Sequence, residues 1–160
     1  MKMVKKISRL GVVARADGGS VITPSDAAMA GVAAERVRLL EAFASAWDEG
    51  DVDTLMDLMD NDCTFSSSTG PGPGAVFSGR LDVRRGFESF LSPGTSRSPK
   101  GEVTGTLVSG DFAVVRWQVL AADGSGDTEV RACDIFEFAG DRIRSKDTYR
   151  KIAAELPPGS

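Results

Sequence analysis

The chain has 160 residues, which is enough for one domain with a substantial hydrophobic core. Its 41% hydrophobic and 26% charged residues are typical of a globular protein, and a net charge of −4 without a basic stripe argues against nucleic-acid binding. No segment reaches the length and apolarity of a membrane span, and the basic N-terminus lacks the apolar run of a signal peptide. We therefore expect a cytoplasmic protein.

The chain contains no histidine. This absence excludes His-based catalytic triads and most zinc and iron sites. Any acid–base chemistry has to come from carboxylates, lysine, water or the single tyrosine, Tyr149. We expect no metal and no cofactor.

Helical patterns dominate the first half of the chain. Residues 1–24 show little periodicity and are expected to form an N-terminal extension. Apolar residues then recur at helical spacing up to Trp47, after which Gly50 ends this helix and Asp51 can cap a second, short one. A strand is expected over 63–68, and a third helix follows Gly79.

The second half has the pattern of a strand meander. Alternating apolar and polar residues are separated by short turns rich in Gly and Asp. Helices followed by antiparallel strands predict an α+β fold in which three N-terminal helices cover one face of a curved sheet. The four strands predicted by this alternation cover residues 102–108, 112–120, 128–138 and 142–150.

The last predicted hairpin brings two carboxylates together. Gly140 and Asp141 form a two-residue turn, and pairing outward from it places Asp134 opposite Asp147 on an otherwise apolar face. Two carboxylates that face each other across neighbouring strands resist double ionisation. One of them can therefore act as a base while its protonated partner donates a proton. Tyr149 shares this face and is expected to hydrogen-bond the developing oxyanion.

A purely structural interpretation of Asp134 remains open. In that case Asp134 accepts hydrogen bonds from a neighbouring backbone group, or from Lys146 after a local bulge. It would then be a satisfied buried group without a catalytic role.

The same alternation predicts a small-molecule pocket. The face that carries Asp134 is mostly apolar, which is typical of a ligand-binding cavity, whereas the opposite face is mixed and suits solvent or a subunit interface. The expected pocket residues are Trp47, Phe65, Phe87, Phe90, Val115, Trp117 and Phe136.

The order of these features resembles the nuclear transport factor 2-like superfamily, and its SnoaL-like branch in particular, over roughly residues 33–152. No single motif is specific, but their order and spacing together are. The motifs are Gly50-Asp51, Leu55-x-x-Leu58, Asp62-Cys-Thr-Phe65, Gly79 before a helix, and Asp134-x-Phe136-x-Phe138 followed by Lys146-Asp-x-Tyr149.

The resemblance implies a cone-shaped fold, with a strongly curved antiparallel sheet wrapped on three helices around an apolar pocket. Residues 25–154 would form the single SnoaL-like domain and 155–160 a C-terminal tail. The resemblance also implies a homodimer formed through the outer face of the sheet. SnoaL-like cyclases use a pocket aspartate without a cofactor, and Asp134 lies at a similar strand position.

Three functions follow from the resemblance. The first is a cofactor-independent cyclase, isomerase or lyase acting on a small hydrophobic carbonyl compound such as a polyketide. The second is a non-catalytic module that binds a small ligand or dimerises. The third is an epoxide hydrolase, whose Arg and two Asp are incomplete here because Ala132 occupies the arginine position.

Overall fold

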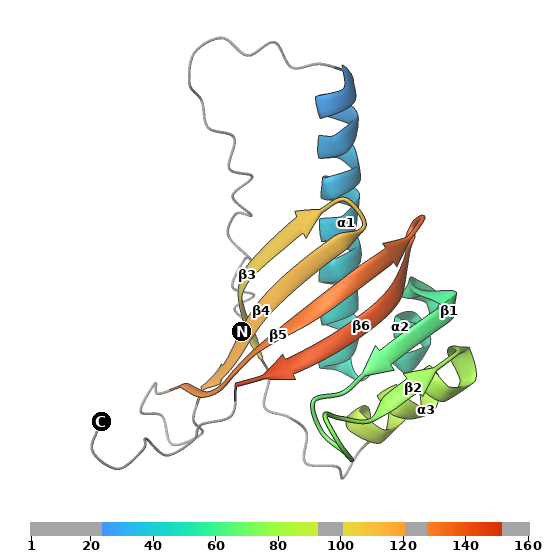
Figure 1. Cartoon of the computed structure of the whole chain (residues 1–160), viewed down its shortest axis with the longest axis vertical. Helices are drawn as coiled ribbons and strands as arrows, with labels where there is room; N and C mark the ends of the chain where they lie inside the picture. The colour runs from blue at the N-terminus through green and yellow to red at the C-terminus, as the bar shows by residue number, and fades with distance from the viewer. Residues whose placement is uncertain (1–23, 93–100, 121–127, 152–160) are drawn as a thin grey trace, which may run out of the picture.

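The computed structural model describes residues 24–92, 101–120 and 128–151 (Figure 1). Most of the predicted extension (1–24), the predicted tail (155–160) and residues 152–154 lie outside these ranges. Helices precede most of the strands, which confirms the α+β class. The elements are α1 (Pro24–Glu49), α2 (Val52–Leu58), β1 (Met59–Ser66), β2 (Val76–Ser78), α3 (Arg80–Leu91), β3 (Glu102–Ser109), β4 (Phe112–Leu120), β5 (Thr128–Ala139) and β6 (Arg142–Arg150).

The six strands form one sheet in the order β2-β1-β6-β5-β4-β3. The meander from β3 to β6 is antiparallel, as predicted. The sequence did not predict β2, nor that β1 would run parallel to β6. Because β1 and β6 are far apart in the chain, no turn fixes their relative direction, so only tertiary packing decides it.

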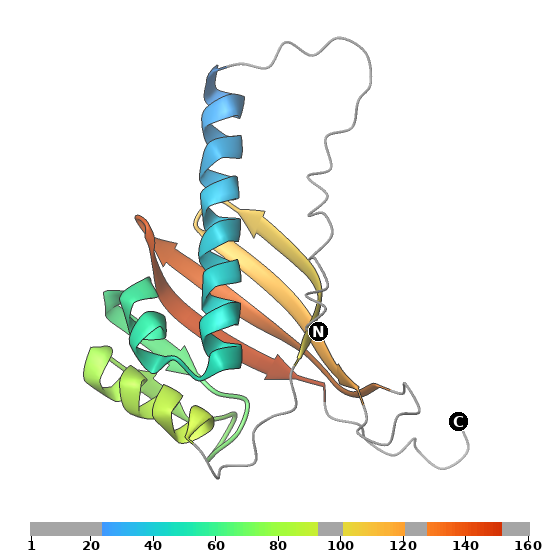
Figure 2. The ribbon, with the colours of Figure 1, turned by 180° about the vertical axis from the view of Figure 1, so that it is seen from behind.

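One face of the sheet packs on α1, and α2 and α3 lie beside β1 and β2 (Figure 2). The N-terminal part of α1 extends past the sheet, and Met29 there is 67% exposed. Phe43 of α1 contacts Phe136 of β5 with ring centroids 5.5 Å apart. The core between helices and sheet also contains the fully buried Leu55 and Phe87. None of the described helices is both long and apolar enough to cross a bilayer.

The junction of α1 and α2 follows the predicted capping pattern. Gly50 has a φ of 73°, a left-handed conformation that glycine adopts without a Cβ clash. The carboxylate of Asp51 accepts a hydrogen bond from the backbone N–H of Thr54 at 3.0 Å and another from its hydroxyl at 2.6 Å. The first bond satisfies one of the free backbone donors at the start of α2, and the second holds the capping carboxylate in place.

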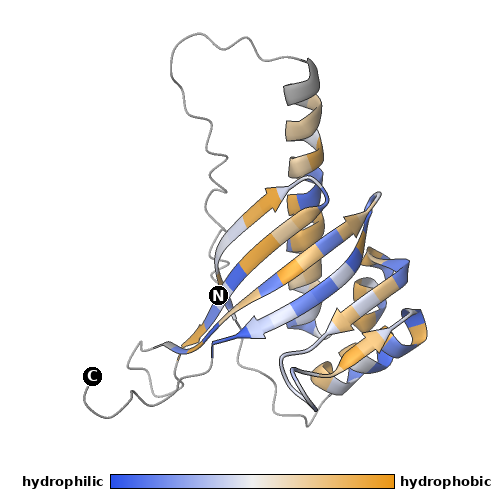
Figure 3. Cartoon of the chain, in the orientation of Figure 1, coloured by the Kyte–Doolittle hydropathy of each residue, from blue (hydrophilic) through white to orange (hydrophobic). Residues whose placement is uncertain are grey.

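Bands of hydrophobic and hydrophilic residues alternate along the strands (Figure 3). On β4 and β5, Ala113 and Phe136 are buried on the side that faces the helices, which we call the inner face. The opposite face, called the outer face, is covered by none of the described helices. It exposes Leu107, Phe112 and Tyr149, whose exposed fractions are 66%, 42% and 53%.

Arg36 ties α1 to the turns of the sheet. Its side chain is only 8% exposed and donates to the Asp111 carboxylate at 2.8 Å and to the carbonyl of Gly140. The guanidinium also stacks over Phe138, 4.4 Å from the ring centroid. One helical side chain thus holds the β3–β4 and β5–β6 turns in place, and so fixes the end of the hairpin that carries the candidate site.

Candidate active site

The β5–β6 hairpin begins as the sequence predicts. Gly140 and Asp141 form the two-residue turn, with φ at Gly140 of 58°, and Phe138 pairs with Ile143. Ile143 is fully buried, in agreement with the hydrophobic pattern that selects this register next to the turn.

A bulge then changes the register. Glu137 pairs with Ser145, although Phe138 pairs with Ile143, so Arg144 is an extra residue on β6. Beyond it, each remaining β6 residue pairs one position away from the prediction. Asp134 is therefore opposite Thr148, and the predicted Asp134–Asp147 pair is wrong.

The bulge places three polar side chains together on the inner face. Nζ of Lys146 lies 3.0 Å from Oδ1 of Asp134 and donates to Oγ1 of Thr148 at 2.6 Å. The Thr148 hydroxyl in turn donates to the same Oδ1 at 2.8 Å. The Lys146 and Asp134 side chains are only 6% and 13% exposed, so the ion pair is largely shielded from water. The sequence predicts a Lys146 contact only as the structural alternative for Asp134, and it gives no indication of Thr148.

Aromatic rings surround the ammonium group of Lys146. Nζ lies 5.1 Å from the ring centroid of Trp47, 5.3 Å from that of Phe65 and 6.0 Å from that of Phe136. At these distances the ring quadrupoles attract the cation. The rings come from α1, β1 and β5, so packing from three elements holds the lysine head in place.

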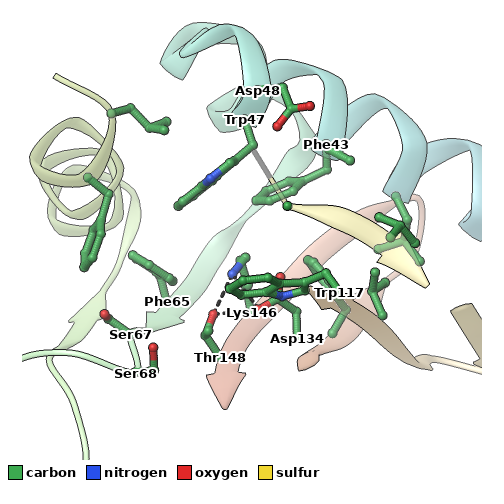
Figure 4. Close-up of a pocket in the computed structure, with 18 of the residues that line it drawn as sticks. Phe43, Trp47, Asp48, Phe65, Ser67, Ser68, Trp117, Asp134, Lys146 and Thr148 are labelled. Carbon is green, nitrogen blue, oxygen red and sulfur yellow. Dashed lines mark hydrogen bonds and ion pairs between the residues drawn. The ribbon is translucent and has the colours of Figure 1, made fainter. Parts of the chain in front are cut away.

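A cavity of about 240 Å³ opens beside this cluster (Figure 4). Asp134, Lys146 and Thr148 lie on its wall, and Ser67, Ser68 and Asp48 add polar groups that the sequence did not predict. Of the predicted pocket residues, Phe87 does not line the cavity; it is fully buried in the core, against Phe43 and Trp47. The predicted residues that do line it are Trp47, Phe65, Phe90, Val115, Trp117 and Phe136.

Asp147 and Tyr149 do not line the cavity. After the bulge they alternate onto the outer face, where Asp147 pairs with Ile135 and Tyr149 with Cys133. Tyr149 donates a hydrogen bond to Asp147, and this bond and the carboxylate charge raise the pKa of the phenol above its ordinary value of 10.0. The geometry therefore gives neither side chain access to a ligand in the cavity.

Arg150 brings a guanidinium to the cavity wall, on the strand next to Ala132. Arg150 pairs with Ala132 across the ladder, lines the cavity and stacks on Trp117 at 5.8 Å. Position 132, where an epoxide hydrolase would have an arginine, is alanine here. The neighbouring strand β6 carries Arg150 opposite this position. Within the described ranges, no three Cys, Asp or Glu side chains gather in a way that could hold a metal ion.

The comparisons with known proteins agree with this architecture. A search of the curated proteins found no match. Among solved structures, a protein from Kribbella flavida that is provisionally assigned as a ketosteroid isomerase is 18% identical, with 79% of this chain and 85% of that chain covered and a TM-score of 0.61. An NTF2-like protein of unknown function from Mesorhizobium loti is 21% identical, with coverages of 74% and 93% and a TM-score of 0.60.

A third structure, a provisionally assigned polyketide cyclase from Sinorhizobium meliloti, is 20% identical, with coverages of 70% and 94% and a TM-score of 0.53. At these identities the similarity is one of fold. The sequence pattern that defines the SnoaL-like domain matches residues 40–146. This range includes Lys146 and the α1 residues that line the cavity. The chain therefore belongs to the SnoaL-like domain family and has the nuclear transport factor 2-like fold.

Proposed function

We propose that the protein is a cofactor-independent enzyme that moves a proton next to the carbonyl group of a small, largely apolar substrate, as a cyclase, isomerase or lyase does. The observation that carries this proposal is the Asp134–Lys146–Thr148 cluster on the wall of an aromatic cavity, in which Lys146 is buried and the other two residues are half-buried. A carboxylate and an ammonium that are largely shielded from water are costly unless they are paired, and at such sites they commonly serve chemistry.

Asp134 is the proposed general base. Both of its contacts, to Lys146 and Thr148, are made by Oδ1. Among the described residues no hydrogen bond or ion pair to Oδ2 is found, so this oxygen is available to a ligand. Because Oδ1 is held on two sides, the carboxylate has a fixed orientation, and Oδ2 can remove a proton from the carbon next to a carbonyl.

Lys146 is the proposed electrophile. An ammonium group has three N–H donors, of which one donates to Thr148, while Asp134 forms an ion pair with Nζ. A remaining N–H can donate to the substrate carbonyl oxygen, which becomes negative as the proton leaves the adjacent carbon. Stabilisation of that charge in a low-dielectric site is typically worth about 10²–10³-fold in rate per donor.

The cavity walls restrict the substrate class. Trp47, Phe65 and Phe136 surround the polar cluster, and Trp117 and Val115 extend the apolar wall. These side chains favour a flat, largely hydrophobic molecule and exclude water from the reacting atoms. The provisional isomerase and cyclase assignments of the K. flavida and S. meliloti proteins are compatible with this class.

The alternative is a non-catalytic module in which the same ion pair only satisfies buried groups. The exposed apolar residues of the outer face, including Leu107 and Phe112, would in either case suit a homodimer, whose mass light scattering would measure.

Deuterium exchange into a ketone separates the enzyme from the binding module. The flat bicyclic ketone 2-tetralone is a suitable probe because its α-protons exchange slowly without a catalyst at neutral pH. We expect the protein to accelerate this exchange in D₂O, as measured by NMR, and Asp134→Asn to abolish the acceleration. Saturable binding of 2-tetralone without accelerated exchange would overturn the catalytic proposal in favour of the binding module.

A further inference from the structure

Lys146 has the surroundings of an amine that can react as a nucleophile. Its side chain is 6% exposed, three aromatic rings surround its Nζ, and it lines a cavity that is large enough for a small organic molecule. Lysines held in hydrophobic pockets can form Schiff bases with carbonyl compounds once the amine has given up its proton. A nucleophilic lysine also needs a nearby group that can take up its proton.

The structure supplies two routes for that proton. Asp134 Oδ1 lies 3.0 Å from Nζ, and the Thr148 hydroxyl forms a chain in which it accepts from Nζ at 2.6 Å and donates to Oδ1 at 2.8 Å. Transfer along either route converts the buried ion pair into a neutral amine and a neutral carboxylic acid.

We infer that Lys146 forms a covalent imine with aldehydes or ketones that enter the cavity. This reaction goes beyond the proposed proton transfer, because it needs a carbonyl group at Nζ but no proton on the carbon next to that carbonyl.

The step balances within the site. The neutral amine attacks the carbonyl carbon, forming a C–N bond, and one amine proton ends on the former carbonyl oxygen to give a carbinolamine. Asp134, which holds the proton from the ammonium, donates it to the departing hydroxyl, so the C–O bond breaks and water leaves. The products are a protonated imine on Lys146, an ionised Asp134 and one water molecule. The positive imine nitrogen thus stays paired with the carboxylate.

Reductive trapping with benzaldehyde tests the inference. Benzaldehyde has no α-proton, so it can form an imine but cannot undergo the exchange that tests the proposed function. The folded protein is incubated with benzaldehyde and sodium cyanoborohydride near neutral pH, and peptides are analysed by mass spectrometry. We expect one benzyl group on Lys146, added at least about tenfold faster than on the exposed Lys151, the other lysine of the described residues.

Matched variants separate the chemistry from surface labelling. Lys146→Met removes the amine while keeping an unbranched side chain, and is expected to lose the fast labelling. Lys151→Met is expected to keep it. Thr148→Val, which breaks the relay, should slow labelling of Lys146, and Thr148→Ser should restore it.

Excess 2-tetralone, which we expect to occupy the cavity, should slow the labelling of Lys146 if the label forms there. Circular dichroism of each variant confirms that it is folded. The inference is overturned if Lys146 in the folded wild-type protein labels no faster than Lys151. It is equally overturned if labelling of Lys146 requires unfolding.

Discussion

Thr148 lies directly opposite Asp134 in the β5–β6 ladder and donates its hydroxyl hydrogen to Asp134 Oδ1 at 2.8 Å. The contact exists because a bulge at Arg144 shifts β6 by one residue. Among the described residues, the hydrogen bond and the ion pair of this carboxylate both involve Oδ1 and none involves Oδ2. The threonine is therefore a positioning residue in the proposed mechanism, since it acts on the base and not on the substrate.

Replacement of Thr148 should reduce proton transfer without removing the base. Thr148→Val keeps the branched shape but loses the hydroxyl, and we expect the rate of 2-tetralone exchange to fall about 10-fold to 100-fold, the value of a hydrogen bond to a charged group. Thr148→Ser should recover most of the rate. If both variants exchange at the wild-type rate, the hydroxyl does not position the base. Equal affinity of all three proteins for 2-tetralone would show that the effect is on the reaction step.

The ion pair between Lys146 and Asp134 should appear as a strong energetic coupling. Lys146→Met leaves a carboxylate that is 13% exposed without its cation, so we expect a loss of about 3 kcal/mol in the free energy of unfolding. Asp134→Asn should also destabilise the protein, because it leaves the ammonium unpaired among aromatic rings.

The double variant Lys146→Met, Asp134→Asn contains neither charge. We expect it to lose clearly less stability than the two single variants added together, with a coupling of at least about 1 kcal/mol. Urea denaturation of the four proteins measures this coupling. Additive losses would show that the two charges do not interact in the folded state.

The titration of Tyr149 tests its contact with Asp147 on the outer face. It is the only tyrosine, so its ionisation can be followed by ultraviolet absorbance. The hydrogen bond to Asp147 and the negative charge of that residue raise the pKa of Tyr149, so Asp147→Asn should bring the titration down toward the ordinary value of 10.0. An unchanged titration in Asp147→Asn would mean that the two side chains are apart.

The Asp51 cap should give a pH-dependent contribution to stability. Hydrogen bonds from the Thr54 side chain and backbone lower the pKa of Asp51 below its ordinary value of 3.8. Since the folded pKa is lower than the unfolded one, the contribution is fully present above the unfolded pKa and is lost as the pH falls through the folded one.

The difference in unfolding free energy between the wild type and Asp51→Ala should therefore be constant near pH 6 and shrink by about pH 3. Urea denaturation at both values measures it, with Asp57→Ala as a control for a nearby exposed carboxylate. A difference that does not change with pH would contradict a role for the charged cap.

The sequence predicted the fold well because its signals are local. Gly50 and Asp51 define the break between α1 and α2, and the Gly140–Asp141 turn defines the last hairpin. Of the seven pocket residues expected from strand alternation and helical spacing, six line the cavity, since an inward-facing residue either lines the cavity or joins the core. Phe87 belongs to the core for a reason that periodicity cannot show: its neighbours Phe43 and Trp47 fill the space around it.

The site itself could not be predicted in the same way. Hydrophobic residues fix a register only where they occur, and after Ile143 the β6 strand has none on its inner face: Lys146, Thr148 and Arg150 are all polar. The bulge at Arg144 therefore has little signature in the sequence. Its cause is tertiary, because the cavity provides a carboxylate for Lys146 and aromatic rings for its ammonium group.

The central claim is that the Asp134 carboxylate transfers a proton in the cavity, and one measurement tests it most directly. Deuterium exchange into 2-tetralone is compared for the wild type, Asp134→Asn and Asp147→Asn, which undergo the same chemical change on opposite faces of the sheet. We expect a loss of about 10²–10⁴-fold in Asp134→Asn and a rate within about twofold of the wild type in Asp147→Asn. Wild-type exchange that persists in a folded Asp134→Asn variant would contradict the claim.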